Sequence, residues 1–174
     1  MKDKKDKKRM NNKGFSFVEL IIAIAILAIM AGVLAPQLIK YIDSSRKSTD
    51  VQNAQAIATA VNIALADEDA YNAAKPADGA VKRYKVDELT GTPPEGGGSL
   101  VQDDFQKKVV EILGTNLPEP KFNSSTNKDF VIIIKNKDSI LSFYIYPYSG
   151  SDVLDPETDT ANQLYPNVGD NYTK

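Results

Sequence analysis

The first third of the chain contains one long apolar run that lies between two charged segments. Residues 20–39 include no charged side chain. An α-helix of that length is about 30 Å long, which matches the hydrocarbon core of a bilayer. A lysine-rich stretch precedes the run, and a single carboxylate, Glu19, lies at its edge. This pattern predicts a helix that spans a membrane.

Beyond the apolar run, the pattern is that of an amphipathic helix from Lys40 to about Tyr71. Its apolar residues recur at steps of three and four, which is typical of a helix that packs on a sheet. They are Val51, Ala54, Ala58, Val61 and Leu65, widened by Ile57. Asp67, Glu68 and Asp69 lie near its end, and we expect the helix to fray there because the helix dipole disfavours anions at a C-terminus.

The second half of the chain predicts a small β-structure. Residues 72–98 are rich in turn residues and predict an irregular connector. A short helix should follow, with Ser99 and Gln102 as a capping box and Gly114 at its end. Residues 129–146 predict an antiparallel hairpin with its turn at 136–138, and its apolar strand 130–134 should be buried on both faces. Residues 147–174 are expected to wrap the surface.

The predicted fold class is therefore α+β. A long N-terminal helix, with a transmembrane half and an amphipathic half, packs on a small antiparallel sheet that forms a globular head. One shared core between this helix and the hairpin is the simplest arrangement for a chain of 174 residues.

Charge is distributed unevenly along the chain. Residues 1–14 hold seven Lys and Arg against two Asp, whereas the whole chain has a net charge of −2. A basic segment before an apolar run predicts a cytoplasmic N-terminus, with the acidic bulk outside. Lysine runs also occur in nucleic-acid-binding tails. This run leads directly into a membrane-length segment, so no nucleic-acid partner is predicted.

The junction between the basic segment and the apolar run contains the most specific pattern. A carboxylate such as Glu19 costs about 2.5–3.5 kcal/mol if it is carried to the bilayer centre, so we expect a compensating positive charge. Cleavage after Gly14 would create one, the α-amino group of Phe15. Further along, Pro36 removes a helix hydrogen bond and clashes with the carbonyl of Gly32, which predicts a soft point or break in the helix.

This junction resembles that of the type IV pilin family. The resemblance rests on Gly14, Phe15, Glu19 and Pro36 at the family's spacing, and it covers about the first third of the chain. It implies a leader of residues 1–14 that is cleaved, N-methylation of Phe15, and a role for Glu19 in assembly. Residues 15–40 would be the transmembrane and assembly helix, and residues 41–174 the globular head. In the filament, the region of Gly32 and Pro36 would melt locally.

The resemblance also implies partners and a location. The chain would lie in membrane lipid before assembly, be processed by a prepilin peptidase that is also an N-methyltransferase, and polymerise with copies of itself. A membrane platform protein and an assembly ATPase complex would build the surface fibre, which would serve adhesion or motility. The chain has no Cys, unlike many Gram-negative pilins with a C-terminal disulfide, which indicates a Gram-positive or clostridial-type major pilin.

Two alternatives remain open at this point. A type II secretion or competence pseudopilin shares the same junction. A monomeric membrane-anchored binding module or enzyme is a reading from another class. A plain signal anchor explains the apolar run and its basic flank, but it does not explain Gly14, Glu19 and Pro36 together.

Residues for catalysis are not apparent, and neither an enzyme activity nor a cofactor is predicted. The chain has no His and no Cys, which removes the usual nucleophile–base pairs. Asp155, Glu157 and Asp159 alternate like calcium ligands, but Thr160 replaces the required glycine. We therefore interpret them as a solvated acidic loop, with no metal site. Asn123 and Asn171 each begin an N-glycosylation sequon, a pattern that is common by chance.

Overall fold

The computed structural model describes residues 14–91, 102–150 and 155–173. The chain divides into two compact units, and the boundary falls between Tyr41 and Ile42. Each unit is described by itself below. Ser99 lies outside the described residues, but Gln102 is described and is not helical. The capping box expected from Ser99 and Gln102 is therefore wrong, because the helix starts only at Asp104.

In the unit before Ile42, the described residues are the non-helical residues 14–16 and the first part of a single long helix, α1 (Phe17–Ala64). Helix α1 has 48 residues and contains the whole apolar run of residues 20–39. Within the described part of the chain, it is the one helix long and apolar enough to cross a membrane, with a mean hydropathy of 2.8 over its most apolar window. The sequence prediction of a long N-terminal helix is confirmed.

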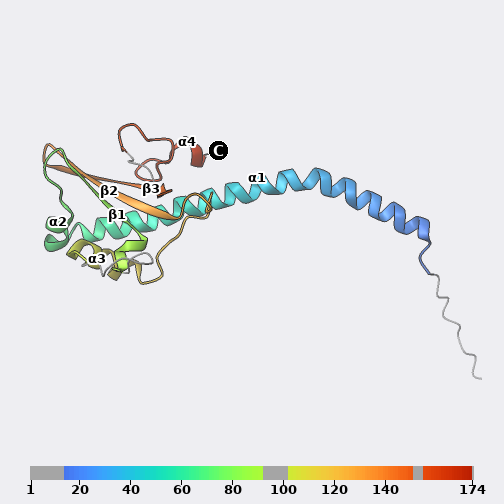
Figure 1. Cartoon of the computed structure of the whole chain (residues 1–174), viewed down its shortest axis with the longest axis horizontal. Coiled ribbons are helices and arrows are strands. Elements are labelled where there is room, and N and C mark those ends of the chain that lie inside the picture. The colour runs from blue at the N-terminus through green and yellow to red at the C-terminus, as the bar shows by residue number, and fades with distance from the viewer. Residues whose placement is uncertain (1–13, 92–101, 151–154, 174) are drawn as a thin grey trace, which may run out of the picture. The chain divides into compact units, whose positions relative to one another are not determined.

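The unit from Ile42 onward is built on a three-stranded antiparallel sheet in the order β1-β2-β3. The strands are β1 (Val81–Lys85), β2 (Asp129–Lys137) and β3 (Ile140–Tyr148). The C-terminal part of α1, from Ala54 to Ala64, packs on this sheet (Figure 1). The buried α1 side chains are Asp50, Ala54, Ile57, Ala58, Ala60, Val61 and Ala64. The predicted α+β class and the shared core of helix and hairpin are confirmed.

The central strand β2 is buried on both faces, as its continuous apolar sequence predicts. Alternate residues of β2 point to opposite faces. Phe130, Ile132 and Ile134 join the core that contains α1, whereas Val131 and Ile133 form a second cluster with Tyr146. The hydroxyl of Tyr146 donates to Gln163 at 3.0 Å, so the C-terminal segment lies over this second face.

The hairpin turn lies at Asp138 and Ser139, later than the predicted 136–138. Both residues have positive φ, 53° and 64°, as a two-residue hairpin connection requires. Asn136 cannot belong to the turn because it pairs with Leu141 in the ladder. Its buried side chain also donates to the carbonyl of Pro76 at 2.9 Å.

The amphipathic helix ends at Ala64, and the expectation that it continues to about Tyr71 is wrong. A separate helix, α2 (Glu68–Ala74), follows, and Asp67 is its N-cap. The Asp67 carboxylate accepts hydrogen bonds from the N–H groups of Asp69 and Ala70, each at 3.1 Å. The acidic residues that are unfavourable at a helix C-terminus are favourable at an N-terminus, so the same charges begin a new helix.

The segment 72–98 is more regular than predicted, because it contains β1 and a short 3-10 helix, η1 (Asp87–Thr90). Three of the five residues of Val81–Lys85 are Lys or Arg, so the composition of this segment did not indicate a strand. Residues 92–98 lie outside the description. The next helix, α3 (Asp104–Leu113), has a capping box made by Asp103 and Gln106, and it ends at Gly114 as expected.

The C-terminal segment takes part in the core, so the expectation that it only wraps the surface is wrong. The N–H of Leu164 donates to the carbonyl of Ile145 at 2.8 Å, and the N–H of Ile145 donates to Tyr165 at 3.2 Å, which places the segment beside β3. Leu164 and Tyr172 are buried. Tyr172 belongs to the short terminal helix α4 (Asp170–Thr173) (Figure 1).

Candidate assembly site

The site predicted from the sequence lies at the beginning of α1. Residues 14–16 are not helical, and α1 starts at Phe17. The carbonyl of Ser16 accepts the first helical hydrogen bond, from Leu20 N at 3.1 Å. Ser16 is therefore the N-cap position of the helix. No atom outside the local chain lies within 4 Å of a side chain added at Gly14, so the backbone at this residue is open.

Glu19 has a partner within its own chain. The N–H of Ser16 donates to the Glu19 carboxylate Oε2 at 2.9 Å. This is the reciprocal contact of a capping box, in which the third helical residue reaches back to the N-cap. The first turn is also where the helix dipole favours an anion. The carboxylate is therefore partly compensated before a neighbouring subunit arrives, a partner that the sequence interpretation did not assign to it.

Phe15 lies directly before this capped turn, and it is 91% exposed. Phe15 directly precedes Ser16, whose N–H donates to Glu19. Gly14, Phe15 and Glu19 thus lie in one short segment. The peptide bond between Gly14 and Phe15 lies before the helix, so cleavage there does not require the helix to unfold. Residues 14–16 are exposed and are not helical, so the peptide bond is accessible to a protease.

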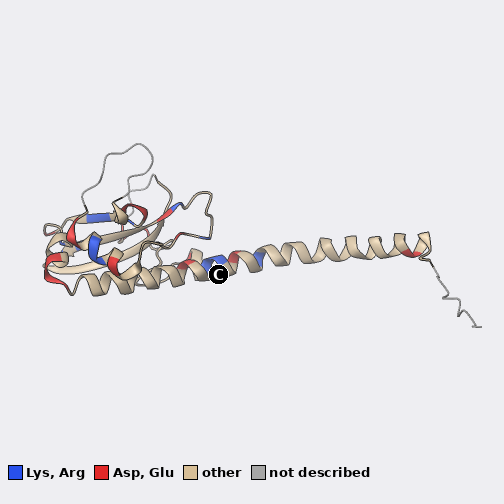
Figure 2. Ribbon diagram, turned by 90° about the horizontal axis from the view of Figure 1, so that it is seen from below, with Lys and Arg blue, Asp and Glu red and all other residues tan. Residues whose placement is uncertain are grey.

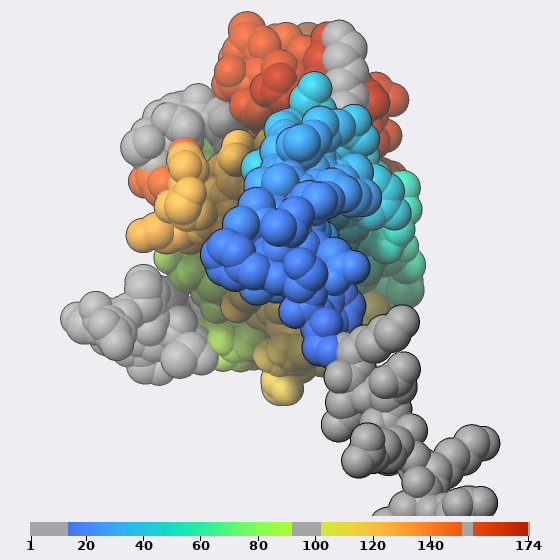
Figure 3. Space-filling model, turned by 90° about the vertical axis from the view of Figure 1, so that its right-hand side faces the viewer, coloured from blue at the N-terminus to red at the C-terminus, as the bar shows by residue number. Residues whose placement is uncertain are grey.

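The apolar part of α1 has no protein cover. Every residue from 14 to 42 is exposed. On the face drawn in Figure 3, the atoms of the N-terminal part of α1 (blue) lie at the surface. Figure 2 shows no Lys, Arg, Asp or Glu along α1 between Glu19 and Lys40. A surface this apolar is unstable in water at roughly 25 cal/mol for each Å². An exposed apolar surface of this extent is typical of a contact with a membrane or with another protein.

Gly32 and Pro36 lie inside α1, which continues through both without a break in the single chain. Transmembrane helices tolerate proline when the freed backbone groups find other partners. A helix break at these residues is not a feature of the isolated subunit. Local melting there on assembly stays a prediction.

The acidic residues considered for calcium have protein partners. Glu157 forms an ion pair with Lys135 and lies near Lys137 at 4.0 Å, and these lysines lower the pKa of its carboxyl. Asp159 accepts a hydrogen bond from the N–H of Asp155 at 2.8 Å. No group of three or more potential metal ligands occurs within the residues that the structure describes.

Sequence reasoning missed Ser16 as part of this site. The signal was present, because Ser16-Phe17-Val18-Glu19 has the Ser-x-x-Glu spacing of a capping box directly before an apolar helix. Glu19 is thus a helix cap as well as a charge at the edge of the apolar run.

The fold and the site together define a membrane-anchored α+β subunit with a processing motif, and comparison with known proteins agrees with that class. The family described as "Prokaryotic N-terminal methylation motif" matches residues 9–35. The chain is 32% identical over 122 residues to Prepilin peptidase-dependent protein A of Clostridium perfringens, covering 70% of this chain and 80% of the relative.

Two further relatives carry pilin names. A Fimbrial protein of Pseudomonas aeruginosa is 30% identical over 129 residues, with 72% of this chain and 80% of the relative covered. The Type IV major pilin protein PilA of Myxococcus xanthus is 34% identical over 61 residues, which cover 35% of this chain and 28% of the relative. No solved structure matches the chain at a comparable level.

The chain belongs to the type IV pilin family. It is a pilin-like structural subunit, and the methylation motif is a substrate site for a processing enzyme rather than a catalytic site. Family membership therefore excludes the reading of the chain as an anchored enzyme.

Proposed function

We propose that this chain is the precursor of a type IV pilus subunit. A prepilin peptidase cuts between Gly14 and Phe15 and methylates the new amino group of Phe15. Residues 1–14 are then a leader, residues 15–40 the transmembrane and assembly helix, and residues 41–174 the head. The observation that carries the proposal is a capped, accessible junction directly before an uncovered apolar helix.

Before assembly, the subunit waits in the membrane with its N-terminus in the cytoplasm and its head outside. The basic leader supports this orientation, because Lys and Arg remain on the cytoplasmic side. A membrane platform protein and an assembly ATPase complex then move the subunit from lipid into a filament. Exchange of lipid for neighbouring apolar helices keeps the surface of α1 away from water throughout.

Glu19 sets the register between subunits in this proposal. The methylated ammonium of Phe15 from a neighbouring copy takes a place at the Glu19 carboxylate within the helical bundle. The attraction is strong in a medium of low dielectric, but desolvation offsets much of it. The contact therefore selects one alignment of the helices, and the apolar surface supplies most of the stability.

A surface fibre that serves adhesion or motility is the form of assembly we favour over a short pseudopilin of a type II secretion or competence system. The Fimbrial protein and major pilin relatives support this choice. Immunogold electron microscopy with antibodies against the head tests it. We expect labelled fibres that extend beyond the cell envelope and that disappear when the coding sequence is deleted. Labelled material confined to the envelope would support the pseudopilin alternative instead.

A further inference from the structure

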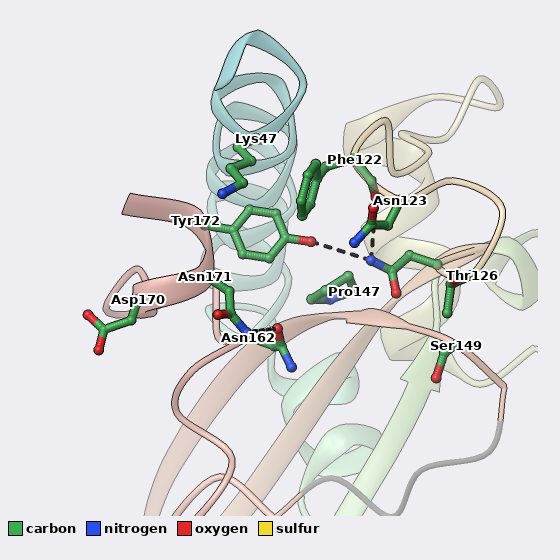
Figure 4. Close-up of a pocket in the computed structure, with 11 residues that line it drawn as sticks. Lys47, Phe122, Asn123, Thr126, Pro147, Ser149, Asn162, Asp170, Asn171 and Tyr172 are labelled. Carbon is green, nitrogen blue, oxygen red and sulfur yellow. Dashed lines mark hydrogen bonds between the residues drawn. The ribbon is translucent and has the colours of Figure 1, made fainter. Parts of the chain in front are cut away.

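A polar recess of about 680 Å³ opens on the unit from Ile42 onward. Four segments that are far apart in the sequence build it: α1 at Lys47, the turn at 122–127, the end of β3, and the C-terminal residues 162–172 (Figure 4). Its volume falls within the range of about 300–1,000 Å³ that is usual for small-molecule sites. The proposed filament function makes no use of it.

The inner wall of the recess is held in place by several contacts. The rings of Phe122 and Tyr172 meet edge to face, with their centroids 5.5 Å apart. The side-chain amide of Asn127 donates to the Phe122 carbonyl and to the Tyr172 hydroxyl, each at 3.4 Å. Behind this wall, the buried carboxylate of Asp50 accepts a hydrogen bond from the N–H of Phe122 at 3.0 Å. The recess is therefore formed before any ligand enters.

Side-chain amides dominate the polar lining. Its asparagines are Asn123, Asn127, Asn162 and Asn171. An amide carries both donors and an acceptor, so it can pair with a hydroxyl group in either direction. The Asn127 Nδ2 group already donates to Phe122 and Tyr172, which leaves the oxygen of Asn127 and the donors of Asn162 as partners for a ligand. Asn171 is oriented by a hydrogen bond from its Nδ2 to Asn162 Oδ1 at 2.8 Å. A ligand with many hydroxyl groups matches this set better than one with a single strong charge.

The charges of the lining balance each other. Of the described residues around the recess, Lys47 is the one cation and Asp170 the one anion. The Lys47 ammonium lies 4.8 Å from the centroid of the Phe122 ring. Sites for phosphate or carboxylate ligands gather several Arg or Lys donors, and this recess does not. Its chemistry therefore favours an uncharged ligand.

The recess also has an apolar floor. Figure 4 shows Pro147 between the amides of Asn162 and Asn171 on one side and Thr126 on the other. Pro147 and the edge of Phe122 offer surface for the C–H groups of a sugar ring, while the surrounding amides reach its hydroxyls.

We propose that this recess binds a neutral saccharide of one or two rings. The inference rests on the recess itself and does not depend on filament assembly. The test is NMR titration of the uniformly ¹⁵N-labelled full chain in detergent micelles. The probes are four neutral disaccharides (lactose, maltose, cellobiose and N,N′-diacetylchitobiose), with inorganic phosphate and tri-alanine as competitors of other chemistry.

We expect saturable shifts at the amides around the recess with at least one disaccharide. Two variants should weaken that binding about five- to tenfold each, as the loss of one or two neutral hydrogen bonds predicts. They are Asn162→Ala and Asn123→Gly, the latter chosen because Asn123 has a φ of 50°, which glycine adopts without strain. Asn116→Ala, an exposed asparagine outside the recess, is the matched control and should bind as the unaltered chain does.

The proposal is overturned if none of the four disaccharides gives saturable shifts while the spectrum shows a folded head. It is equally overturned if phosphate or tri-alanine binds more tightly than every disaccharide. Equal binding by the Asn162→Ala and Asn116→Ala variants would place the ligand elsewhere on the molecule.

Discussion

The carboxylate of Glu19 accepts a hydrogen bond from the backbone N–H of Ser16 at 2.9 Å. This contact joins the last residue before α1 to its first turn, so the charge that should align subunits also caps its own helix. Cleavage after Gly14 would leave Ser16 in place and create an ammonium on Phe15, one residue away. The role of Glu19 as a cap and its role in the intersubunit contact can therefore be tested separately. One substitution removes the charge but keeps the oxygen that accepts from Ser16, and another removes both.

Substitution of Glu19 distinguishes these two roles. Glu19→Gln keeps an oxygen that can accept from Ser16 N–H but has no charge, whereas Glu19→Ala removes both. We expect both variants to insert and to be processed, because loss of a charge from the edge of the apolar run eases insertion. Loss of a charge-assisted hydrogen bond is worth about 1.5–3 kcal/mol, so both should reduce fibre number about tenfold or more.

The measurement is fibre number by electron microscopy, with processed subunit followed by immunoblot. Asp43→Ala, which removes an acidic residue further along α1, is the control and should assemble normally. If Glu19→Gln makes fibres as the unaltered chain does and Glu19→Ala does not, the residue acts through its helix cap. Normal fibres in both variants would remove Glu19 from assembly.

The stability of the head should fall as pH rises, because of Asp129. Burial raises the pKa of this carboxyl to about 8 from an ordinary value of 3.8, and the neighbouring Asp87 carboxyl adds to the increase. The folded head then holds the proton more tightly than the unfolded chain does. The resulting stabilisation is complete below about pH 4 and is lost progressively up to about pH 8.

Urea unfolding at pH 5 and pH 8, followed by near-ultraviolet circular dichroism, checks this pH dependence. Asp129→Asn cannot ionise, so its change in unfolding free energy between the two pH values should be smaller than that of the unaltered chain. Glu119→Gln, an exposed carboxylate, is the control. An equal pH dependence for Asp129→Asn and the unaltered chain would show that Asp129 is not the responsible group.

Gly169 holds the C-terminal segment in a close turn. A Cβ added at this residue would overlap the carbonyl oxygens of Thr160 and Ala161. The Gly169 N–H also donates to the Gln163 carbonyl at 2.7 Å. We expect Gly169→Ala to lower the unfolding free energy of the head by about 1–3 kcal/mol, as overpacking does.

Gly32→Ala provides the comparison for this prediction, since a Cβ there meets no atom within 4 Å. The urea midpoint of the head should be unchanged in that variant and lower in Gly169→Ala. A Gly169→Ala variant as stable as the unaltered chain would mean that the C-terminal turn relaxes freely.

Periodicity and apolar content predicted the parts of the fold that they control. The uncharged run of residues 20–39 is long enough to predict a membrane-length helix, and the short length and β-branched residues of the run around Ile132 favour a buried strand. The junction at Gly14 and Phe15 was equally visible, since its residues are neighbours in the sequence.

Features that depend on distant partners could not be predicted in the same way. Asp50 reads as a polar residue beside the apolar stripe, but it is fully buried and binds the N–H groups of Lys121 and Phe122 at 2.6 and 3.0 Å. The sequence around residue 50 contains no pattern that predicts a contact with residues 121 and 122. The placement of Leu164 beside Ile145 has the same cause, because a pairing across about twenty residues leaves no local pattern.

The central claim is that this chain is cut after Gly14, methylated at Phe15 and built into a surface fibre. Intact-mass spectrometry of subunits from sheared, purified fibres tests all three parts at once. The account predicts one species that lacks residues 1–14 and carries one additional methyl group, and fragmentation should place that group on the amino group of Phe15. Fibres made of the full-length chain, or of a chain cut at another residue, would contradict it.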